Sequence, residues 1–231
     1  MTEARGNWES VIASDGVARV ENVFSTQQVE EVANTIAKQA VQKSRAGIRH
    51  ALRLPSVAEV AHDHRLLSLA QQVLGPTATP FRATLFDKSP SSNWLVVWHQ
   101  DTALPLRRKS TATGWGPWST KEGLIYAHAP AHALSQILAL RLHLDDCTAD
   151  NGPLRCLPST HTRGVLSDDE ITEFAHKVEP VEFLLHAGSV MGMRPLVIHA
   201  SSKSKSDCPR RVLHIEYSAV SSFDGLELAK G

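Results

Sequence analysis

The stretch Asn93-Trp-Leu-Val-Val-Trp-His-Gln-Asp101 decides how this chain is organised, because it ends an apolar strand with two side chains that bind metals. His99 and Asp101 are two positions apart. The side chains of a strand alternate between its two faces, so both can point to one side while Trp98 and Gln100 point to the other. The stretch therefore supplies half of a predicted metal site.

A third ligand has to come from elsewhere in the chain, and His199 is the best candidate, at the end of Met193-Arg-Pro-Leu-Val-Ile-His199. Two histidines and one carboxylate on one face of an ion suit non-haem Fe(II), because this set leaves coordination positions open for a cosubstrate and O₂. The alternative is that His99 only ends a strand and that Asp101 caps the next element. The residues favour an iron-dependent oxygenase.

A second His-x-Asp pair, His143 and Asp145, competes with the first, and a pattern this short also arises by chance. Asp145 leads into the turn signal Asn151-Gly152, so we interpret it as part of a hairpin entrance. Strand alternation places Arg141 on the same face as His143, and we expect that face to line the pocket. Both could contact cosubstrate or substrate. Equally, Arg141 could pair with Asp145 or Glu216 as plain scaffolding.

Length and charge favour a single domain over residues 1–231 and exclude several kinds of partner. The 24 Lys and Arg balance the 24 Asp and Glu, and no basic run exceeds Arg107-Arg108-Lys109, which argues against nucleic acid and anionic membranes. The N-terminus carries no targeting signal and no window is apolar enough to span a bilayer, so we expect a cytoplasmic protein. The three cysteines form no Cys-x-x-Cys pair and are expected to be reduced. The sequence leaves the oligomeric state open.

Helices are expected at three places, each opened by a capping-box pattern. A first strand at 16–23 precedes them, and Gly75-Pro76 should stop the second helix. The N-terminal helices thus cover about residues 26–75. The three patterns and their helices are Ser25 to Gln28 with a helix at 26–43, Ser56 to Glu59 with apolar periodicity up to 74, and Ser167 to Glu170 with a helix to about 177.

From Phe81 onward, short strand-like runs separated by turn residues predict a mainly β sandwich or barrel with flanking helices. The expected strands are 80–88, 94–99, 136–144, 153–157, 180–186, 189–194 and 211–219. Residues 102–135 are expected to form a long loop, and loops of that length are often lids or binding loops. Trp115 and Trp118 in it are either lid aromatics over the pocket or anchors that pack on the core.

A series of motifs in fixed order adds a family resemblance. The motifs are Phe86-Asp-Lys-Ser-Pro, Asn93-Trp94, Trp98-His-Gln-Asp101, Leu142-His-Leu-Asp-Asp146, Asn151-Gly-Pro-Leu154, Pro158-Ser-Thr-His161, Arg194-Pro, His199-Ala-Ser-Ser202 and Pro209-Arg-Arg211. From about residue 15 to 219 the chain resembles bacterial members of the phytanoyl-CoA dioxygenase family. The resemblance implies a double-stranded β-helix (jelly roll, cupin-like) fold, and an enzyme that uses Fe(II), 2-oxoglutarate as cosubstrate and O₂. It also implies hydroxylation or a related oxidation of a small-molecule substrate, with release of succinate and CO₂.

By the same resemblance, His99, Asp101 and His199 become the iron ligands, and Arg210 is the position expected to hold the distal carboxylate of 2-oxoglutarate. A planar guanidinium suits that task, because it forms two parallel charge-assisted bonds with a carboxylate and keeps its charge. Arg211 follows directly and should face the other way. Asp101 stands where related halogenases bind a halide, so halogenation is not expected.

Other residues of the matching blocks have open roles. Lys88 and Asn93 are candidates for contacts with the cosubstrate, although a lysine at a strand end is often solvated. His161 is better explained as a hydrogen-bonded structural histidine than as a ligand. The chain departs from the family at Ser159, where glycine is usual and a turn is affected, and at Arg141, where many relatives carry tryptophan.

His128 and His132 are four residues apart, the spacing of a zinc pair on a helix, but Pro130 between them argues against that helix. We expect both in a loop, where they could face the substrate. The substrate is expected to be a small polar metabolite, such as an amino acid or a natural-product intermediate. Two other functions stay open: a jelly-roll metal-binding protein without redox activity, and a metal-dependent barrel enzyme that does not use 2-oxoglutarate. Arg210 has no evident role in either.

Overall fold

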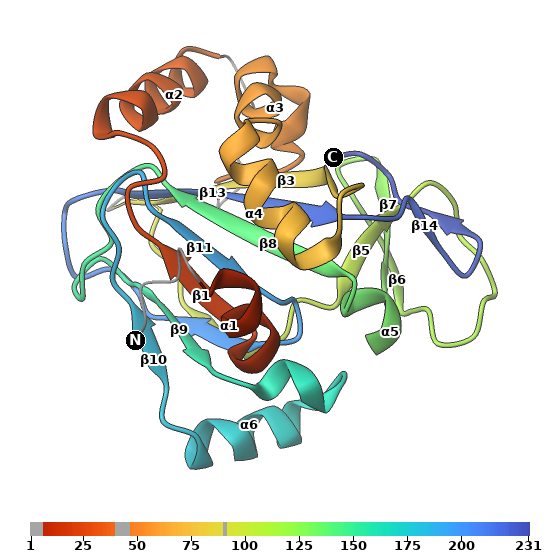
Figure 1. Cartoon of the computed structure of the whole chain (residues 1–231). Coiled ribbons are helices and arrows are strands. Elements are labelled where there is room, and N and C mark those ends of the chain that lie inside the picture. The colour runs from red at the N-terminus through yellow and green to blue at the C-terminus, as the bar shows by residue number, and fades with distance from the viewer. Residues whose placement is uncertain (1–6, 40–46, 90–91) are drawn as a thin grey trace.

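Two antiparallel β-sheets face each other and form the body of the protein (Figure 1). The computed structural model describes residues 7–39, 47–89 and 92–231. One sheet runs in the order β1 (Val17–Val20), β11 (Val190–Met193), β8 (Ile137–His143), β13 (Arg210–Ser218), β3 (Thr79–Lys88) and β2 (Gly47–Ile48). The other runs in the order β10 (Val181–Phe183), β9 (Leu154–Leu157), β12 (Ile198–Ser201) and β4 (Val96–His99). The predicted jelly roll is confirmed, and each predicted strand appears within or close to its expected bounds.

The central strands β8 and β13 decide which side chains enter the barrel. Every residue of β8 is buried, as expected for a strand that is covered on both faces. Leu140 on β8 and Ile215 on β13 belong to the core cluster formed with the helices. Because side chains alternate, Arg141 on β8 and both Arg210 and His214 on β13 face the opposite way, into the barrel.

Four N-terminal helices cover the outer face of the six-stranded sheet (Figure 1), and their apolar side chains form the largest core cluster with it. They are α1 (Trp8–Asp15), α2 (Thr26–Lys38), α3 (Pro55–Ala61) and α4 (His64–Leu74), with the short 3₁₀ turn η1 (Ala51–Arg53) before α3. The sequence pattern missed α1. On the smaller sheet, η2 (Thr160–Arg163) precedes α6 (Asp168–Lys177), which packs on Leu157 and Ile198. No helix in the described ranges is long and apolar enough to cross a membrane.

The helix starts test the capping-box predictions directly. Ser25 and Ser167 form complete capping boxes, as expected. The box predicted at Ser56 is wrong, because Pro55 is already the first residue of α3 and no side chain caps that helix. Proline suits the first helical turn, where its missing N–H is not needed. The helix then ends, and the Asp63 side chain caps α4 by accepting a hydrogen bond from the backbone N–H of Arg65. The predicted helix at 26–43 ends at Lys38, and its last expected residues lie outside the described ranges.

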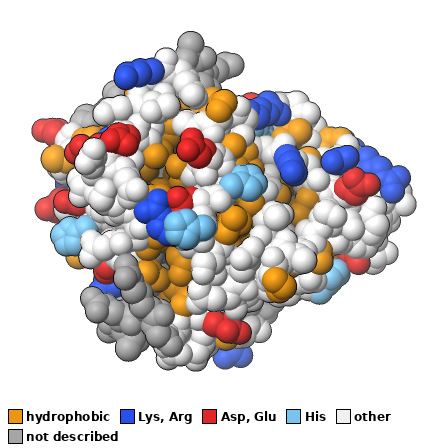
Figure 2. Space-filling view, turned by 45° about the horizontal axis from the view of Figure 1, so that its top comes forward, with side chains coloured by type: hydrophobic (Ala, Val, Ile, Leu, Met, Phe, Trp, Pro, Cys, Tyr) orange, Lys and Arg blue, Asp and Glu red, His pale blue; other side chains and the backbone are white. Residues whose placement is uncertain are grey.

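The segment 102–135, expected to be a long loop, contains a third sheet. Its strands are ordered β5 (Ala103–Leu106), β7 (Leu124–His128) and β6 (Trp118–Lys121), and the short helix α5 (Ala131–Leu134) follows. The prediction failed because these strands are short and are interrupted by Gly and Pro, so only their pairing reveals them. The hairpin β14 (Ser222–Phe223) and β15 (Leu226–Glu227) packs beside this sheet. Figure 2 shows Lys and Arg side chains gathered over the end of the molecule that carries β7 and β14.

Candidate metal and cosubstrate site

The three predicted metal ligands come together at one end of the barrel. His99 ends β4, His199 lies in β12, and the two are direct partners across this antiparallel pair. The register shifts between His199 and Ser201, and an irregularity of this kind re-aims side chains and is common beside functional sites. The backbone N–H of Asp101 donates to the Pro195 carbonyl at 2.9 Å, which fixes the turn that carries the carboxylate.

Donor atoms of these three side chains converge on one point. One Asp101 oxygen lies 3.6 Å from His99 Nε2, and the other lies 3.6 Å from His199 Nε2. The two imidazole ring centroids are 4.2 Å apart. One possible ligand atom from each residue lies within 4.8 Å of those from the other two. Among the described residues, this is the group of histidine, cysteine and acidic side chains whose geometry suits a metal ion.

The hydrogen bonds of both imidazoles prepare them for a metal. His99 Nδ1 donates to the Val97 carbonyl and His199 Nδ1 donates to the Val197 carbonyl, each at 2.9 Å. A carbonyl only accepts, so Nδ1 carries the proton and the Nε2 lone pair is left to face Asp101. Metal-binding histidines commonly make this second contact, which fixes ring tautomer and orientation. These residues therefore fit a non-haem Fe(II) ion with open coordination positions.

The electrostatics of the site match this assignment. Burial lowers the pKa of His199 to about 4, so this imidazole is neutral and ready to bind a metal. Burial alone would lower the pKa of His99, but the neighbouring Asp101 carboxylate outweighs it and raises that pKa above its usual value, so a metal ion would compete with a proton for His99 Nε2. Burial alone would raise the pKa of Asp101, but the neighbouring His199 and His99 rings outweigh it and hold that pKa well below its usual value. The carboxylate is thus ionised.

A cavity of about 110 Å³ adjoins the three ligands and extends to two buried arginines. Its lining residues come from both sheets and are Phe86, Trp94, Val96, His99, Asp101, Arg141, Leu154, His199, Ser201 and Arg210. With Arg141 and Arg210 on its wall and a metal at Asp101, such a cavity is suited to a small dicarboxylate. Strand parity predicted Arg141 on this wall, and the family resemblance predicted Arg210. His143, which was expected beside Arg141, does not line this cavity, and neither argument gave a role here to Phe86, Trp94 or Ser201.

The turn after β8 fixes the position of the Arg210 side chain. Its Nε donates to the Asn151 carbonyl at 3.2 Å, and only 3% of the residue is exposed. Asn151 is itself fixed, since its side chain accepts from the Thr148 N–H and donates to the Asp146 carbonyl. Burial lowers the pKa of Arg210. The guanidinium is therefore oriented before any ligand arrives.

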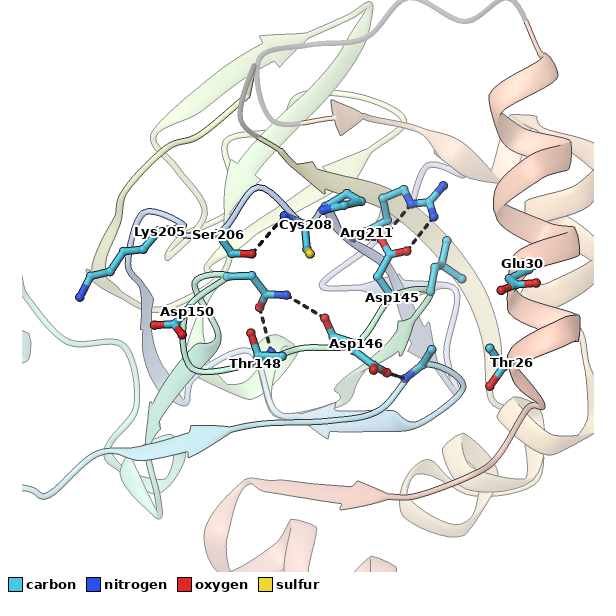
Figure 3. Close-up of a pocket in the computed structure, with 14 residues that line it drawn as sticks. Thr26, Glu30, Asp145, Asp146, Thr148, Asp150, Lys205, Ser206, Cys208 and Arg211 are labelled. Carbon is cyan, nitrogen blue, oxygen red and sulfur yellow. Dashed lines mark hydrogen bonds and ion pairs between the residues drawn. The ribbon is translucent and has the colours of Figure 1, made fainter.

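A second cavity, of about 760 Å³, lies on the other side of this turn and is lined by none of the three metal-binding candidates. Figure 3 shows Asp145 and Arg211 paired on its wall. The Asp145 carboxylate accepts from the Arg211 backbone N–H at 2.7 Å, and from its side-chain Nε at 2.8 Å and Nη2 at 2.6 Å. Arg211 thus faces away from Arg210, as predicted, and Asp145 secures the strand instead of a metal.

Arg141 belongs to a buried polar row that sequence reasoning did not assemble. Its Nη1 contacts His214 Nδ1 at 2.9 Å, and its Nε is buried without a hydrogen-bond partner. Burial and the nearby Arg210 lower the pKa of Arg141 to about 10. The alternative pairings with Asp145 or Glu216 are wrong, because Asp145 binds Arg211 and Glu216 binds Arg82. His214 could have been found from its position on the same face as Arg210.

Lys88 and Asn93 lie beside the cavity but do not line it. Lys88 is 1% exposed, so the solvated alternative is wrong, and its Nζ donates to Ser201 Oγ at 2.9 Å and the Ser202 carbonyl at 2.6 Å. Burial and Arg210 lower the pKa of Lys88 to about 8. Asn93 exchanges two hydrogen bonds with the Ser204 backbone. Both residues brace the loop that follows β12.

The remaining candidates lie outside the metal group. His161 packs against Gly16, where a Cβ atom would come within 2.3 Å of its ring. His128 ends β7 and contacts Thr102 Oγ1 at 2.7 Å, whereas His132 lies in α5 and contacts the Asp224 carboxylate at 3.0 Å. The expectation that both histidines lie in a loop is therefore wrong.

The two tryptophans of this segment are anchors and not lid residues. Trp115 is 7% exposed and donates to the same Asp224 carboxylate, and Trp118 packs on the same core. The cysteines Cys147, Cys156 and Cys208 are free.

Comparison with known proteins agrees with this geometry. An L-proline trans-4-hydroxylase from Streptomyces griseoviridis is 24% identical over 183 residues, which are 68% of this chain and 60% of that protein. AviO1 from Streptomyces viridochromogenes superposes with a TM-score of 0.68 at 18% identity, over 99% of both chains. EctD from S. alaskensis with 2-oxoglutarate and 5-hydroxyectoine superposes with a TM-score of 0.72 at 20% identity, over 95% of this chain and 78% of that one. These structural likenesses show the fold.

Family membership rests on a longer match. The family model described as phytanoyl-CoA dioxygenase (PhyH) matches residues 12–212, a range that contains the three metal-binding candidates and both arginines of the cavity. The chain therefore belongs to the phytanoyl-CoA dioxygenase family of non-haem oxygenases, which use Fe(II), 2-oxoglutarate and O₂.

Proposed function

We propose that the protein is a single-domain Fe(II)- and 2-oxoglutarate-dependent dioxygenase that hydroxylates or otherwise oxidises a small molecule, with release of succinate and CO₂. One observation carries the proposal. Two imidazole Nε2 atoms and a carboxylate converge beside a cavity with a buried, oriented guanidinium, Arg210, on its wall. A protein that only bound metal would need neither the arginine nor the cavity.

His99, Asp101 and His199 would hold Fe(II) through His99 Nε2, His199 Nε2 and one carboxylate oxygen. When bound, iron with 2-oxoglutarate and O₂ supplies the oxidation of a substrate C–H bond. The chain's own task is to place the donors on one side of the ion with each Nε2 lone pair facing it. The two carbonyl contacts serve that task, because they hold the proton of each ring on Nδ1. An ionised Asp101 also fills the position that a halide would need, so halogenation is not part of the proposal.

Arg210 would bind the distal carboxylate of 2-oxoglutarate, because a guanidinium can donate two parallel hydrogen bonds to it. Arg141 would make a second contact from the neighbouring strand, with its unpartnered buried Nε available to a ligand. Direct contacts of Lys88 and Asn93 with the cosubstrate stay predictions. Their hydrogen bonds within the chain favour an indirect part, in which they hold the loop around Ser201 in place.

The substrate is proposed to be a small polar metabolite of the amino-acid type. Support comes from the matched L-proline trans-4-hydroxylase and from EctD with 5-hydroxyectoine. The chain spans 60% of the length of that hydroxylase, so the proposal concerns the chemical class and no particular compound. A cytoplasmic location and the lack of nucleic-acid or membrane partners stay predictions.

Anaerobic addition of Fe(II) and then 2-oxoglutarate tests the proposal without a substrate. A weak visible charge-transfer band is expected in the wild type and should be absent in His199→Ala, which lacks one ligand. His186→Ala, an exposed histidine outside the site, is the matched control. The absence of a band in wild-type protein that binds Fe(II) would favour a metal-dependent enzyme without 2-oxoglutarate. Failure to bind Fe(II) would refute the whole proposal.

A further inference from the structure

The three-stranded sheet presents one polar face. Residues directly opposite each other in an antiparallel pair lie on the same face. Lys121 pairs with Leu124, Tyr126 pairs with Ser119, and Ala103 pairs with His128. Because Leu124, Tyr126 and His128 alternate along β7, this face carries Lys121, Tyr126 and His128 together. The opposite face carries Ala127 and Leu104, which are buried in the apolar core.

A chain of contacts connects this polar face to the metal site. Ala103 follows Asp101 by two residues, and its carbonyl accepts from Arg82 Nη1 at 2.9 Å. The Arg82 guanidinium lies 5.7 Å from the centroid of the Tyr126 ring, and Lys121 Nζ lies 5.2 Å from it. Arg82 and Lys121 therefore both lie against the Tyr126 ring, and Arg82 also binds the residue that begins β5, two positions after Asp101.

The three cations in this region differ in their partners. Arg82 is paired with the buried carboxylate of Glu216. Arg49 pairs with Glu122, in the turn between β6 and β7, at 3.2 Å. Lys121 forms an ion pair with no acid among the described residues. One positive charge at the edge of the predicted active site is thus left without a counter-charge.

The ionisation of Lys121 reflects the same crowding. Burial lowers its pKa, the charges of Arg49 and Arg82 lower it further, and Asp101 opposes them. The charges of both arginines and of the Asp101 carboxylate therefore all act on the Lys121 ammonium. An anion bound at this place would relieve the repulsion between the cations. Once Asp101 is engaged by a metal ion, it offers less compensation to Lys121.

From these contacts we infer that the substrate carries an anionic group, a carboxylate or a phosphate, which binds Lys121 on the polar face of the β5-β7-β6 sheet. Tyr126, which is buried, would support Lys121 from below, and the reacting carbon would lie toward the metal at Asp101. This inference rests on the proposed function, since it places a substrate over the same metal site. It narrows the substrate class to acids.

Relaxation of small anions by a paramagnetic metal tests the inference without knowledge of the substrate. The full chain is loaded with Mn(II) in place of Fe(II) and saturated with 2-oxoglutarate, and metal loading is checked by electron paramagnetic resonance. Acetate is then titrated with ¹H detection and inorganic phosphate with ³¹P detection, so that the two arms separate a carboxylate from a phosphate site. A saturable relaxation enhancement is expected for at least one of the anions in the wild type.

The variants decide whether Lys121 carries the binding. Lys121→Gln should weaken anion binding about tenfold, whereas Lys121→Arg should keep it within a few-fold. Lys177→Gln also removes one positive charge, but from α6, which is distant from this sheet in the sequence. This variant should leave anion binding unchanged. Added salt should weaken the wild-type effect because the lysine is exposed.

Four results would overturn the inference. Enhancement that persists in Lys121→Gln would mean that the anion binds the metal directly or elsewhere. Equal losses in Lys121→Gln and Lys177→Gln would indicate a general charge effect. No enhancement in Mn-loaded wild type would refute the anion site and leave the proposed function standing. Failure to bind Mn(II) at all would instead refute the proposed function together with the inference.

Discussion

His99 and His199 face each other directly across the β4–β12 pair, with paired Cα positions and ring centroids 4.2 Å apart. Each ring donates Nδ1 to the carbonyl of the residue two positions earlier, so the same local contact sets both tautomers. Two positions that are far apart in the chain thus present matching Nε2 lone pairs to one carboxylate. A metal site in this protein depends on this pairing of strands.

Loss of one ligand should abolish tight metal binding. We expect His199→Ala and Asp101→Ala each to weaken Fe(II) binding by at least about 100-fold, since even outer contacts of a metal site are commonly worth 10- to 100-fold. Anaerobic titration calorimetry measures the affinity, and circular dichroism checks that each variant is folded. Wild-type affinity in either variant would exclude the assigned ligand set.

The two adjacent arginines should behave differently. Arg210→Lys is expected to weaken 2-oxoglutarate binding about tenfold or more, because an ammonium cannot donate two parallel hydrogen bonds to a carboxylate. Arg211→Lys should leave the affinity unchanged and lower stability, because Arg211 binds Asp145 on the outer side. The anaerobic charge-transfer band gives both affinities. A larger loss of affinity in Arg211→Lys would mean that the strand parity is misassigned.

The buried Arg82–Glu216 pair should be costly to break on one side only. Glu216→Gln leaves the Arg82 guanidinium without its counter-charge, and we expect a loss of about 3–5 kcal/mol in the free energy of unfolding. The double variant Arg82→Met with Glu216→Leu should lose less, because it removes both buried charges. Urea unfolding of the wild type, Glu216→Gln and the double variant checks this. A larger loss in the double variant than in Glu216→Gln would indicate that the unpaired charge of Arg82 carries no cost.

His143 should make the protein sensitive to mild acid. Both its ring nitrogens are buried without partners, and burial, with Arg141 and Arg210, holds its pKa well below the usual value. The folded protein therefore keeps His143 neutral, while the unfolded chain takes up a proton below about pH 6.5. Stability from this group is complete above that pH and falls as the pH drops, by about 1.4 kcal/mol per unit.

His143→Leu removes this dependence. When the pH is lowered from 7.5 to 5.5, the free energy of unfolding of the wild type should fall by about 1 kcal/mol or more beyond the fall in the variant. Urea unfolding of both proteins at both pH values measures the difference, in which the other titrating groups cancel. An identical pH dependence in the two proteins would show that His143 is protonated or solvated in the folded state.

Ser159 adopts a left-handed conformation, with φ at +66°, at the position where the family usually has glycine. Its Oγ donates to the Ser14 carbonyl at 3.0 Å, which offsets part of the strain. We expect Ser159→Gly to raise the free energy of unfolding by up to about 1 kcal/mol. Ser159→Ala, which keeps the Cβ and loses the hydrogen bond, should lower it. Thermal unfolding compares the three proteins, and metal binding should not change in any of them.

Strand alternation made several site residues predictable from the sequence. The rule is local, because each side chain turns to the face opposite its neighbour whatever the rest of the fold does. It placed His99 with Asp101 on one side, and it separated Arg210 from Arg211. The capping boxes at Ser25 and Ser167 were predictable for the same reason, since all their hydrogen bonds lie within four residues.

Predictions failed where a local signal had competitors. Ser56 and Glu59 have the capping spacing, but Pro55 starts the helix one residue earlier, so the serine lies inside it. In the segment 102–135, Gly and Pro residues lie in and between three short strands, so the sequence pattern did not reveal them. These strands are stabilised by pairing with one another. Neither outcome could be decided from residue types alone.

By itself, the sequence determined the family, and it predicted the metal-binding candidates and the side of each strand on which they lie, because motif order and strand alternation act over short distances. Tertiary structure decided the partners: Arg141 contacts His214, Asp145 contacts Arg211, and Lys88 is buried against Ser201. Partner choice depends on which strands become neighbours and how deeply a charge is buried. Both are fixed only when distant segments pack, since an ion pair is selected by the geometry of the whole barrel.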